Sequence, residues 1–365
     1  ECIMKRIAIL GPAPPYRGGI SLFAFSLAEA YRDLGYQVQF INFKEQYPQL
    51  LFPGKGQYDY TITDNEFVNK RILVPWQPKT WGQTIYEIKQ YKPDAIIVSW
   101  FLPYFAPAYG YIIKRIPNTP IIILAHNILA HEKWILEKQL LKYVFKPATK
   151  IVTLSKATLE ELHNELPLYI SKKGVLGFHP CYEHYISEVV PFPQRNTLLF
   201  FGLIKPYKGL DVLLRAMPKV INAVPDAKLI IAGEVYGKCD VYTELINSLG
   251  IGSKVECYFR FISDPEIAHF FSQSCLCILP YKSASQSGVI ATSYSFGVPV
   301  LASNVGGLGE YVAEGETGYL VPPDNPSALA EKIILHLTQK PDMRKAIDNF
   351  TKRYSWKALA ELTLQ

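Results

Sequence analysis

Two turns rich in glycine and serine, at residues 283–287 and 304–309, carry the side chains best suited to chemistry. Three serines of the first turn can cap a helix predicted over 289–296, and a helix that carries Glu310 is predicted after the second turn. A short buried strand is predicted between them. Because the first N–H groups of a helix lack partners within it, each turn predicts an anion site. Two such sites suit a ligand with phosphates and neighbouring hydroxyls, such as a nucleotide sugar.

A pair of lysines follows the strand predicted over 197–201. Gly202 comes directly after this strand, and Lys205 and Lys208 precede the next predicted helix. Two cations at this position could neutralise the charge that builds on a leaving diphosphate. A solvated loop would also tolerate two lysines, so both interpretations stay open.

The first half of the chain offers two further candidates, each directly after a predicted strand. Gly18 and Gly19 are paired glycines, which allow either a ligand or a neighbouring segment to approach the backbone closely. His126, followed by Asn127, ends a strand predicted over 120–125. Ligands of doubly wound sheets bind beyond the carboxyl ends of the strands, which favours a ligand contact for His126 over a structural role.

Strands and helices alternate on both sides of a proline-rich break at 178–196. This alternation predicts an α/β protein with two doubly wound, Rossmann-like domains facing a cleft. We expect an N-terminal domain over 1–185, a nucleotide-sugar-binding domain over 186–345, and a C-terminal helix over 346–365 that returns to the first domain. Residues 44–80 are predicted to be irregular. The strands are predicted at 5–10, 37–42, 95–99, 120–125, 150–154, 197–201, 228–232, 255–261 and 299–302, and the longer helices at 20–34, 210–224, 242–249 and 289–296.

The composition is that of a globular protein large enough for two cores, with 365 residues of which 49% are hydrophobic. Six cysteines without a C-x-x-C pair indicate free thiols and a cytoplasmic protein. Met4 is followed by two basic residues and a predicted strand, so no secretory signal is expected. The uncharged stretch 95–113 contains two prolines and a glycine, and is predicted to be strand, loop and helix rather than a membrane span.

The positive charge lies mostly in the first half. Residues 1–190 hold 21 Lys and Arg against 16 Asp and Glu, which gives +5 of the net charge of +6. Because there is no dense basic stripe, no nucleic-acid partner is expected. The basic, aromatic stretch 132–150 predicts either a helix in peripheral contact with an anionic membrane or an ordinary helix packed inward.

Together these motifs resemble the retaining, two-domain (GT-B) nucleotide-sugar glycosyltransferases of family four, also called glycosyl transferases group 1. The resemblance covers nearly the whole chain. It rests on the Gly-Gly turn, the histidine at 126, G-x5-K-G at 202–209, G-x-P-V…G-G-x-x-E at 297–310, E-G-x-T-G-Y-L-V-P-P-D at 314–324, and the late Ser355-Trp356.

The resemblance implies that Lys208 binds the donor diphosphate and that backbone N–H groups at 287–289 hold phosphate. It also implies that the paired glycines lie beside the donor and that His126 contacts the transferred sugar. The predicted catalytic residues are His126 and Lys208, and the predicted donor-binding residues are Gly18, Gly19, Asn127, Gly202, Lys205, Gln286, Ser287, Gly288, Val289, Thr292 and Glu310.

The chain departs from the family pattern at two places. Leu203 stands where the family has an arginine, and Lys205 is the candidate replacement for that charge. Ala284 and Thr292 stand where the family has two glutamates that hold sugar and ribose hydroxyls. Gln286, Ser287 and Thr292 are the candidate replacements.

The predicted activity is transfer of a sugar, with retention, from a UDP- or GDP-linked donor to a hydroxyl of a saccharide, lipid-linked or protein-linked acceptor. No cofactor is expected, and no metal is expected either, because the chain has no Asp-x-Asp. A non-catalytic relative that binds a nucleotide or sugar, or partners another transferase, is the alternative that the missing glutamates suggest. An epimerase of the same fold is a third.

Overall fold

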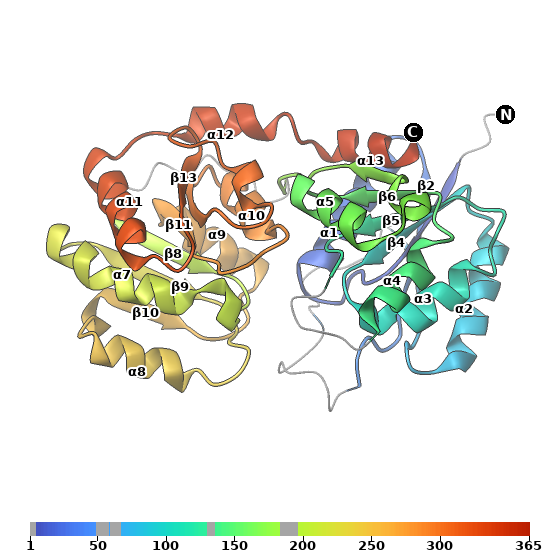
Figure 1. The fold of residues 1–365 in the computed structure, drawn as a ribbon, viewed down its shortest axis with the longest axis horizontal. Coiled ribbons are helices and arrows are strands. Elements are labelled where there is room, and N and C mark those ends of the chain that lie inside the picture. Colours follow the sequence, from blue (N-terminus) through green and yellow to red (C-terminus); the bar gives the residue numbers. More distant parts are fainter. Residues whose placement is uncertain (1–4, 49–57, 59–66, 130–135, 183–195) are drawn as a thin grey trace. The chain divides into compact units, whose positions relative to one another are not determined.

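The computed structural model describes residues 5–48, 58, 67–129, 136–182 and 196–365. The chain forms two compact units (Figure 1). Unit 1 comprises Glu1–His179 and Ser355–Gln365, and unit 2 comprises Pro180–Tyr354. The chain therefore leaves unit 1 after His179 and returns after Tyr354, rather than after the predicted residues 185 and 345.

Unit 1 is built on a seven-stranded parallel sheet with the order β3-β2-β1-β4-β5-β6-β7. Its inner strands are almost wholly apolar and buried, because helices cover both faces. The strands are β1 (Arg6–Leu10), β2 (Gln37–Phe43), β3 (Val68–Leu73), β4 (Ala95–Trp100), β5 (Ile121–Ala125), β6 (Lys150–Thr153) and β7 (Gly174–Leu176).

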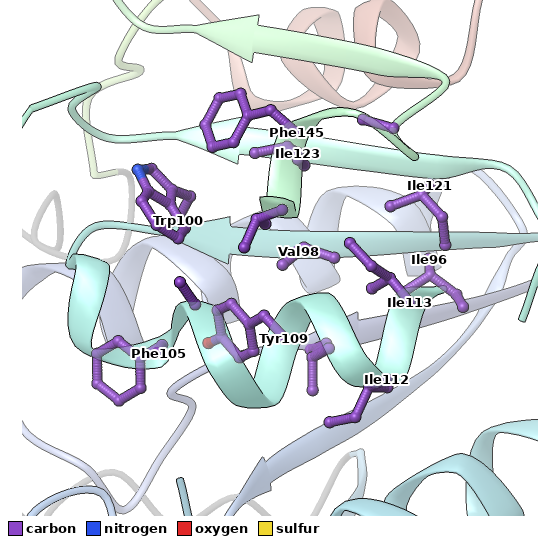
Figure 2. Packing of buried hydrophobic residues seen from close by; sticks show 14 of the residues in the cluster. Ile96, Val98, Trp100, Phe105, Tyr109, Ile112, Ile113, Ile121, Ile123 and Phe145 are labelled. Carbon is purple, nitrogen blue, oxygen red and sulfur yellow. The ribbon is translucent and has the colours of Figure 1, made fainter. Parts of the chain in front are cut away.

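One core of unit 1 lies between the sheet and helix α3 (Figure 2). Val98 of β4 faces Tyr109 and Ile113 of α3, Ile123 of β5 lies beside Phe145, and all five are buried. The helices of unit 1 are α1 (Gly19–Asp33), α2 (Pro78–Tyr91), η2 (Pro103–Phe105), α3 (Ala106–Ile113), α4 (Glu137–Phe145), α5 (Lys156–Glu165), α6 (Leu168–Ser171) and α13 (Trp356–Leu364), where η marks a 3-10 helix.

The C-terminal helix α13 packs against α1 within unit 1. Their contact includes a buried hydrogen bond of 2.5 Å between the hydroxyls of Tyr31 and Thr363. Trp356 adds an edge contact with Phe23, with ring centroids 4.8 Å apart. The last helix of the chain thus stabilises the first.

Unit 2 is built on a six-stranded parallel sheet with the order β10-β9-β8-β11-β12-β13. The strands are β8 (Thr197–Phe201), β9 (Lys228–Ala232), β10 (Val255–Tyr258), β11 (Leu276–Leu279), β12 (Val300–Ser303) and β13 (Gly318–Val321). The helices are η4 (Pro206–Lys208), α7 (Leu210–Ala223), α8 (Asp240–Ser248), η5 (Gly252–Lys254), α9 (Asp264–Ser272), α10 (Gly288–Ser295), η6 (Leu308–Tyr311), α11 (Pro326–Gln339) and α12 (Arg344–Thr351).

Each sheet reverses its strand order at one place, between β1 and β4 in unit 1 and between β8 and β11 in unit 2. Ligands of doubly wound sheets bind at the carboxyl ends of the strands beside such a switch point. The prediction of two doubly wound, Rossmann-like domains is confirmed.

The prediction that residues 44–80 are irregular needs correction, because they contain β3 and the start of α2. The predicted helix that carries Glu310 is η6, a 3-10 helix of only four residues. The helix within 132–150 is α4, whereas residues 130–135 lie outside the described residues.

The stretch 95–113 forms β4, η2 and α3, as predicted. Among the described residues, no helix has both the length and the apolar character needed to cross a membrane.

Candidate active site

The switch point of unit 2 brings three of the predicted residues together. A β-carbon placed on Gly202 would lie 3.5 Å from Lys208 Nζ and 3.4 Å from Val289 Cγ2. Gly202 follows β8, Lys208 ends η4, and Val289 lies in the first turn of α10. The amine and the start of a helix therefore converge where the fold favours a ligand.

Lys208 is a half-buried cation without a counter-ion among the residues that the structure describes. Its Nζ lies 5.2 Å from the ring centroid of Tyr281, a cation–π contact that holds the side chain in place. Burial lowers the pKa of the Lys208 amine below its ordinary value. A charge that is partly removed from water and unpaired is stabilised when an anion binds beside it.

The loop between β11 and α10, residues 280–287, is fixed against the segment that carries Lys208. The N–H of Lys282 donates to the Tyr207 carbonyl at 2.7 Å, and Lys282 Nζ pairs with Asp211 at 2.9 Å. Gly209 has φ +67°, and a β-carbon there would lie 1.9 Å from the Pro280 carbonyl oxygen. Glycine is required at 209 both by this conformation and by this close approach.

The start of α10 keeps backbone donors available for an anion. The hydroxyl of Ser287 caps the helix by accepting from the N–H of Val289 at 3.3 Å. The N–H groups of Ser287 and Gly288 have no acceptor within the described ranges of the chain. Gln286 Oε1 is buried there and likewise has no partner. These donors and the helix dipole favour negative charge at this end of α10.

The second turn supports the first loop, and its predicted anion site stays a prediction. The N–H of Gly307 donates to the Ser285 carbonyl at 3.1 Å, and the N–H of Leu308 donates to the Val305 carbonyl at 3.1 Å. A β-carbon on Gly306 would lie 1.6 Å from the Ala284 carbonyl oxygen. The second turn therefore packs directly under residues 284–285.

The structure also places three further predicted donor-binding residues. Lys205 Nζ lies over the ring of Tyr236, 4.4 Å from its centroid, in the loop after β9. Thr292 is only 7% exposed, and its hydroxyl donates to the Gly288 carbonyl of its own helix. Glu310 is half-buried in η6.

In unit 1, Gly18 and Gly19 begin α1 beside open space. A β-carbon on either glycine would meet no atom within 4 Å. Gly18 has φ +114°, a conformation that other residues rarely adopt. These glycines are therefore not required by tight packing in the described part of the chain, which leaves the backbone open to a ligand.

His126 follows β5, and its ring lies against α1 about one helical turn beyond Gly19. Its ring packs edge-on against Phe23, with centroids 5.0 Å apart, and Phe23 also packs against His179 and Trp356. His126 is 6% exposed, and its Nε2 has no partner within the described residues. Burial, followed by the nearby His179, lowers the pKa of His126 to about 3. The imidazole is therefore neutral at pH 7 and retains one unused ring nitrogen, and the half-buried Asn127 follows it.

The sequence motifs do not include the aromatic residues that hold these groups. Tyr281, which lies over Lys208, directly follows Pro280 at the carboxyl end of β11, and that position is a usable signal. His179 lies in the proline-rich stretch that was interpreted as a break. In the described parts of the chain, no three His, Cys, Asp or Glu side chains come together to hold a metal ion.

Two family profiles match almost all of the chain between them. The one described as glycosyl transferases group 1 matches residues 183–353, and the one described as glycosyltransferase family 4 matches residues 17–172. An uncharacterized glycosyltransferase of Methanocaldococcus jannaschii is 27% identical over 94% of this chain and 92% of its own. A D-inositol 3-phosphate glycosyltransferase of Rhodococcus erythropolis is 32% identical, over only 47% of this chain and 41% of that enzyme.

Solved structures share the fold at low sequence identity. A sucrose-phosphate synthase from Thermosynechococcus elongatus superimposes with a TM-score of 0.76 at 19% identity, covering 99% of this chain and 98% of its own. The Anabaena protein Alr3699/HepE, solved in complex with UDP-glucose, gives a TM-score of 0.77 at 16% identity and 98% coverage of both chains. The chain belongs to the family four, group 1 glycosyltransferases, GT-B enzymes that use nucleotide-sugar donors.

Proposed function

We propose that this glycosyltransferase moves a hexosyl group, with retention of configuration, from a UDP- or GDP-sugar to a hydroxyl of a saccharide, lipid-linked or protein-linked acceptor. Such a reaction belongs to glycan or glycolipid biosynthesis. The observation that carries the proposal is the amine of Lys208, which has no counter-ion among the described residues and lies beside Gly202 and the start of α10 at the switch point of unit 2.

The site suits a leaving diphosphate. As the bond between the anomeric carbon and the diphosphate oxygen breaks, negative charge builds on that oxygen. The ammonium of Lys208 and the N–H groups of Ser287 and Gly288 stabilise this charge, and the fixed loop 280–287 lets them do so without reorganising. This arrangement supports a reaction in which no metal ion bridges the diphosphate.

Retention follows if the acceptor attacks from the face that the diphosphate leaves. The acceptor oxygen then bonds to the anomeric carbon while its proton passes to the departing diphosphate oxygen, so the protein need not supply a base. His126, neutral at pH 7, is suited to hold a hydroxyl of the transferred sugar through Nε2. The protein contributes position and electrostatic stabilisation.

The choice of donor is supported by one neighbour in particular. Alr3699/HepE has been solved in complex with UDP-glucose, so a uridine nucleotide is the first donor class to test. The experiment is a screen of UDP- and GDP-sugars against simple saccharide acceptors, which measures thermal stabilisation and release of nucleoside diphosphate together. Turnover with one donor class is expected. Absence of both stabilisation and turnover across donors and acceptors would count against the proposal.

A non-catalytic protein that binds a nucleotide or sugar is favoured by one observation. Ala284 and Thr292 replace the family's two glutamates, and the Thr292 hydroxyl bonds to its own helix. In the same screen, stabilisation by nucleotides without turnover of any donor would identify this alternative.

A further inference from the structure

A second candidate site lies at the amino ends of the unit 1 strands, whereas His126 lies at their carboxyl ends. A cavity of about 800 Å³ opens there between the ends of α2 and α3. Four exposed cations line it, namely Lys89, Lys92, Lys114 and Arg115. None of its lining residues is acidic, so the cavity concentrates positive charge.

No carboxylate among the described residues pairs with these four cations. Lys114 lies over the ring of Tyr143 at 3.7 Å, and Arg115 donates to the Tyr111 carbonyl at 3.1 Å. The side chains of Lys89 and Lys92 make neither a cation–π contact nor a hydrogen bond with the part of the chain that is described. Cations at helix C-termini offset the helix dipole, but that role requires no cavity between them.

The floor of the cavity is apolar. Ile85 and Ile88 of α2, together with Pro93 and Ile116, are buried and line it. The volume falls in the range of small-molecule sites and is far larger than an inorganic phosphate fills. A ligand that matches both the cations and the apolar floor of the cavity carries an anionic group and an apolar part.

The cavity is separate from the proposed reaction centre. Pro93 lies just before β4 and Thr119 just before β5, whereas His126 follows the other end of β5. Strands of this length place their amino and carboxyl ends roughly 17–20 Å apart. A ligand here therefore acts as an anchor or an effector, not as the sugar donor.

We propose that this cavity binds a phosphate group joined to an apolar chain. Phosphate monoesters carry close to two negative charges at pH 7, which suits Lys89 and Lys92 acting together. The chain would lie on Ile88 and Ile116. A membrane phospholipid and a soluble phosphorylated amphiphile share this chemistry, and the test separates them.

The test uses the full chain and dihexanoyl phosphatidic acid, kept monomeric, as the soluble probe. Lys89→Ala/Lys92→Ala removes two cavity charges. Lys79→Ala/Lys172→Ala removes two exposed charges of the same unit that do not line the cavity, and serves as the matched control. We expect saturable binding by the wild type and the control, and binding about 30-fold weaker in the cavity variant.

Sedimentation with phosphatidylcholine vesicles, with and without long-chain phosphatidic acid, identifies the source. Binding only to the anionic vesicles, lost in the cavity variant, indicates a membrane lipid; binding of the soluble probe without sedimentation indicates a soluble ligand. No saturable binding to either probe, or equal weakening in both double variants, overturns the proposal. Glycosyl transfer between soluble substrates should persist in the cavity variant, so this result is independent of the proposed function.

Discussion

At the scale of single residues, both predicted catalytic residues carry a group that lacks the partner its chemistry calls for. Lys208 has a charge without a counter-ion, and His126 has a ring nitrogen without a hydrogen-bond partner, within the described residues. Unsatisfied buried polar groups are costly, and each one needs an explanation such as a functional role. Each group therefore gives a prediction that separates function from packing.

Lys208→Ala should lower turnover at least tenfold and weaken binding of the nucleoside diphosphate. A charge-assisted contact of about 1.5–3 kcal/mol is lost. Lys208→Met keeps most of the apolar stem over Tyr281 and should behave alike, which attributes the effect to charge. Steady-state kinetics measure the turnover, and calorimetry measures the affinity for the nucleoside diphosphate. Kinetics close to wild type in both variants would remove Lys208 from the site.

His126→Phe should keep the aromatic packing against Phe23 but remove the free Nε2. We expect turnover to fall strongly while affinity for free nucleoside diphosphate changes little, because the proposed diphosphate contacts lie in unit 2. His126→Ala, which also leaves a cavity, should lower the melting temperature as well. If His126→Phe turns over like wild type per folded molecule, the histidine is structural only.

The depressed pKa of His126 predicts a loss of stability in acid. The unfolded chain protonates this histidine near pH 6.5, whereas the folded chain does so only near pH 3. The unfolded state therefore binds more protons between these values, and the free energy of unfolding falls as the pH falls through them. The loss is about 2 kcal/mol between pH 6.5 and pH 5. Denaturant titrations should show that the free energy of unfolding depends less steeply on pH in His126→Phe than in the wild type. The same pH dependence in both proteins would contradict this prediction.

At the scale of elements, the site depends on how closely three loops of unit 2 pack. Gly209 contacts the start of the 280–287 loop and Gly306 its middle, and a β-carbon on either would overlap a carbonyl oxygen. Interiors packed this closely transmit strain to their neighbours. The loop that presents Ser287 and Gly288 is therefore sensitive to changes beneath it.

Gly306→Ala should displace this loop and weaken nucleotide binding. Gly315→Ala is the matched control, because Gly315 also has a positive φ but has nothing within 4 Å of a β-carbon. Both variants should lose about 1–2 kcal/mol of stability from the left-handed conformation. Only Gly306→Ala should also weaken binding of the nucleoside diphosphate by calorimetry. Equal affinities in the two variants would refute the role of the second turn.

The elements were predictable where a strand is wholly apolar. The expected 197–201 and 228–232 agree with β8 and β9, because buried parallel strands read as continuous apolar runs. β3 was missed because it lies at the sheet edge and carries Asn69, Lys70 and Arg71. The contacts of Lys208 with Tyr281, and of Gly306 with Ala284, join residues distant in sequence, and no local pattern encodes them.

At the scale of the whole molecule, each unit has its own switch point, and predicted residues lie beside both. The glycine pair and His126 belong to unit 1, whereas Gly202, Lys208 and the start of α10 belong to unit 2. Because the family profiles match both units, the two groups of residues belong to one enzyme. We therefore propose that unit 2 stabilises the leaving diphosphate with a lysine and backbone N–H groups while the sugar is transferred with retention.

The measurement that tests this claim most directly is the anomeric configuration of the product, determined by NMR on a reaction run in excess EDTA with the best donor of the screen. We expect sustained turnover and a product with the donor's configuration. We also expect the same reaction with Lys208→Met to be at least tenfold slower. An inverted product, or activity abolished by EDTA and restored by Mg²⁺ or Mn²⁺, would contradict this claim.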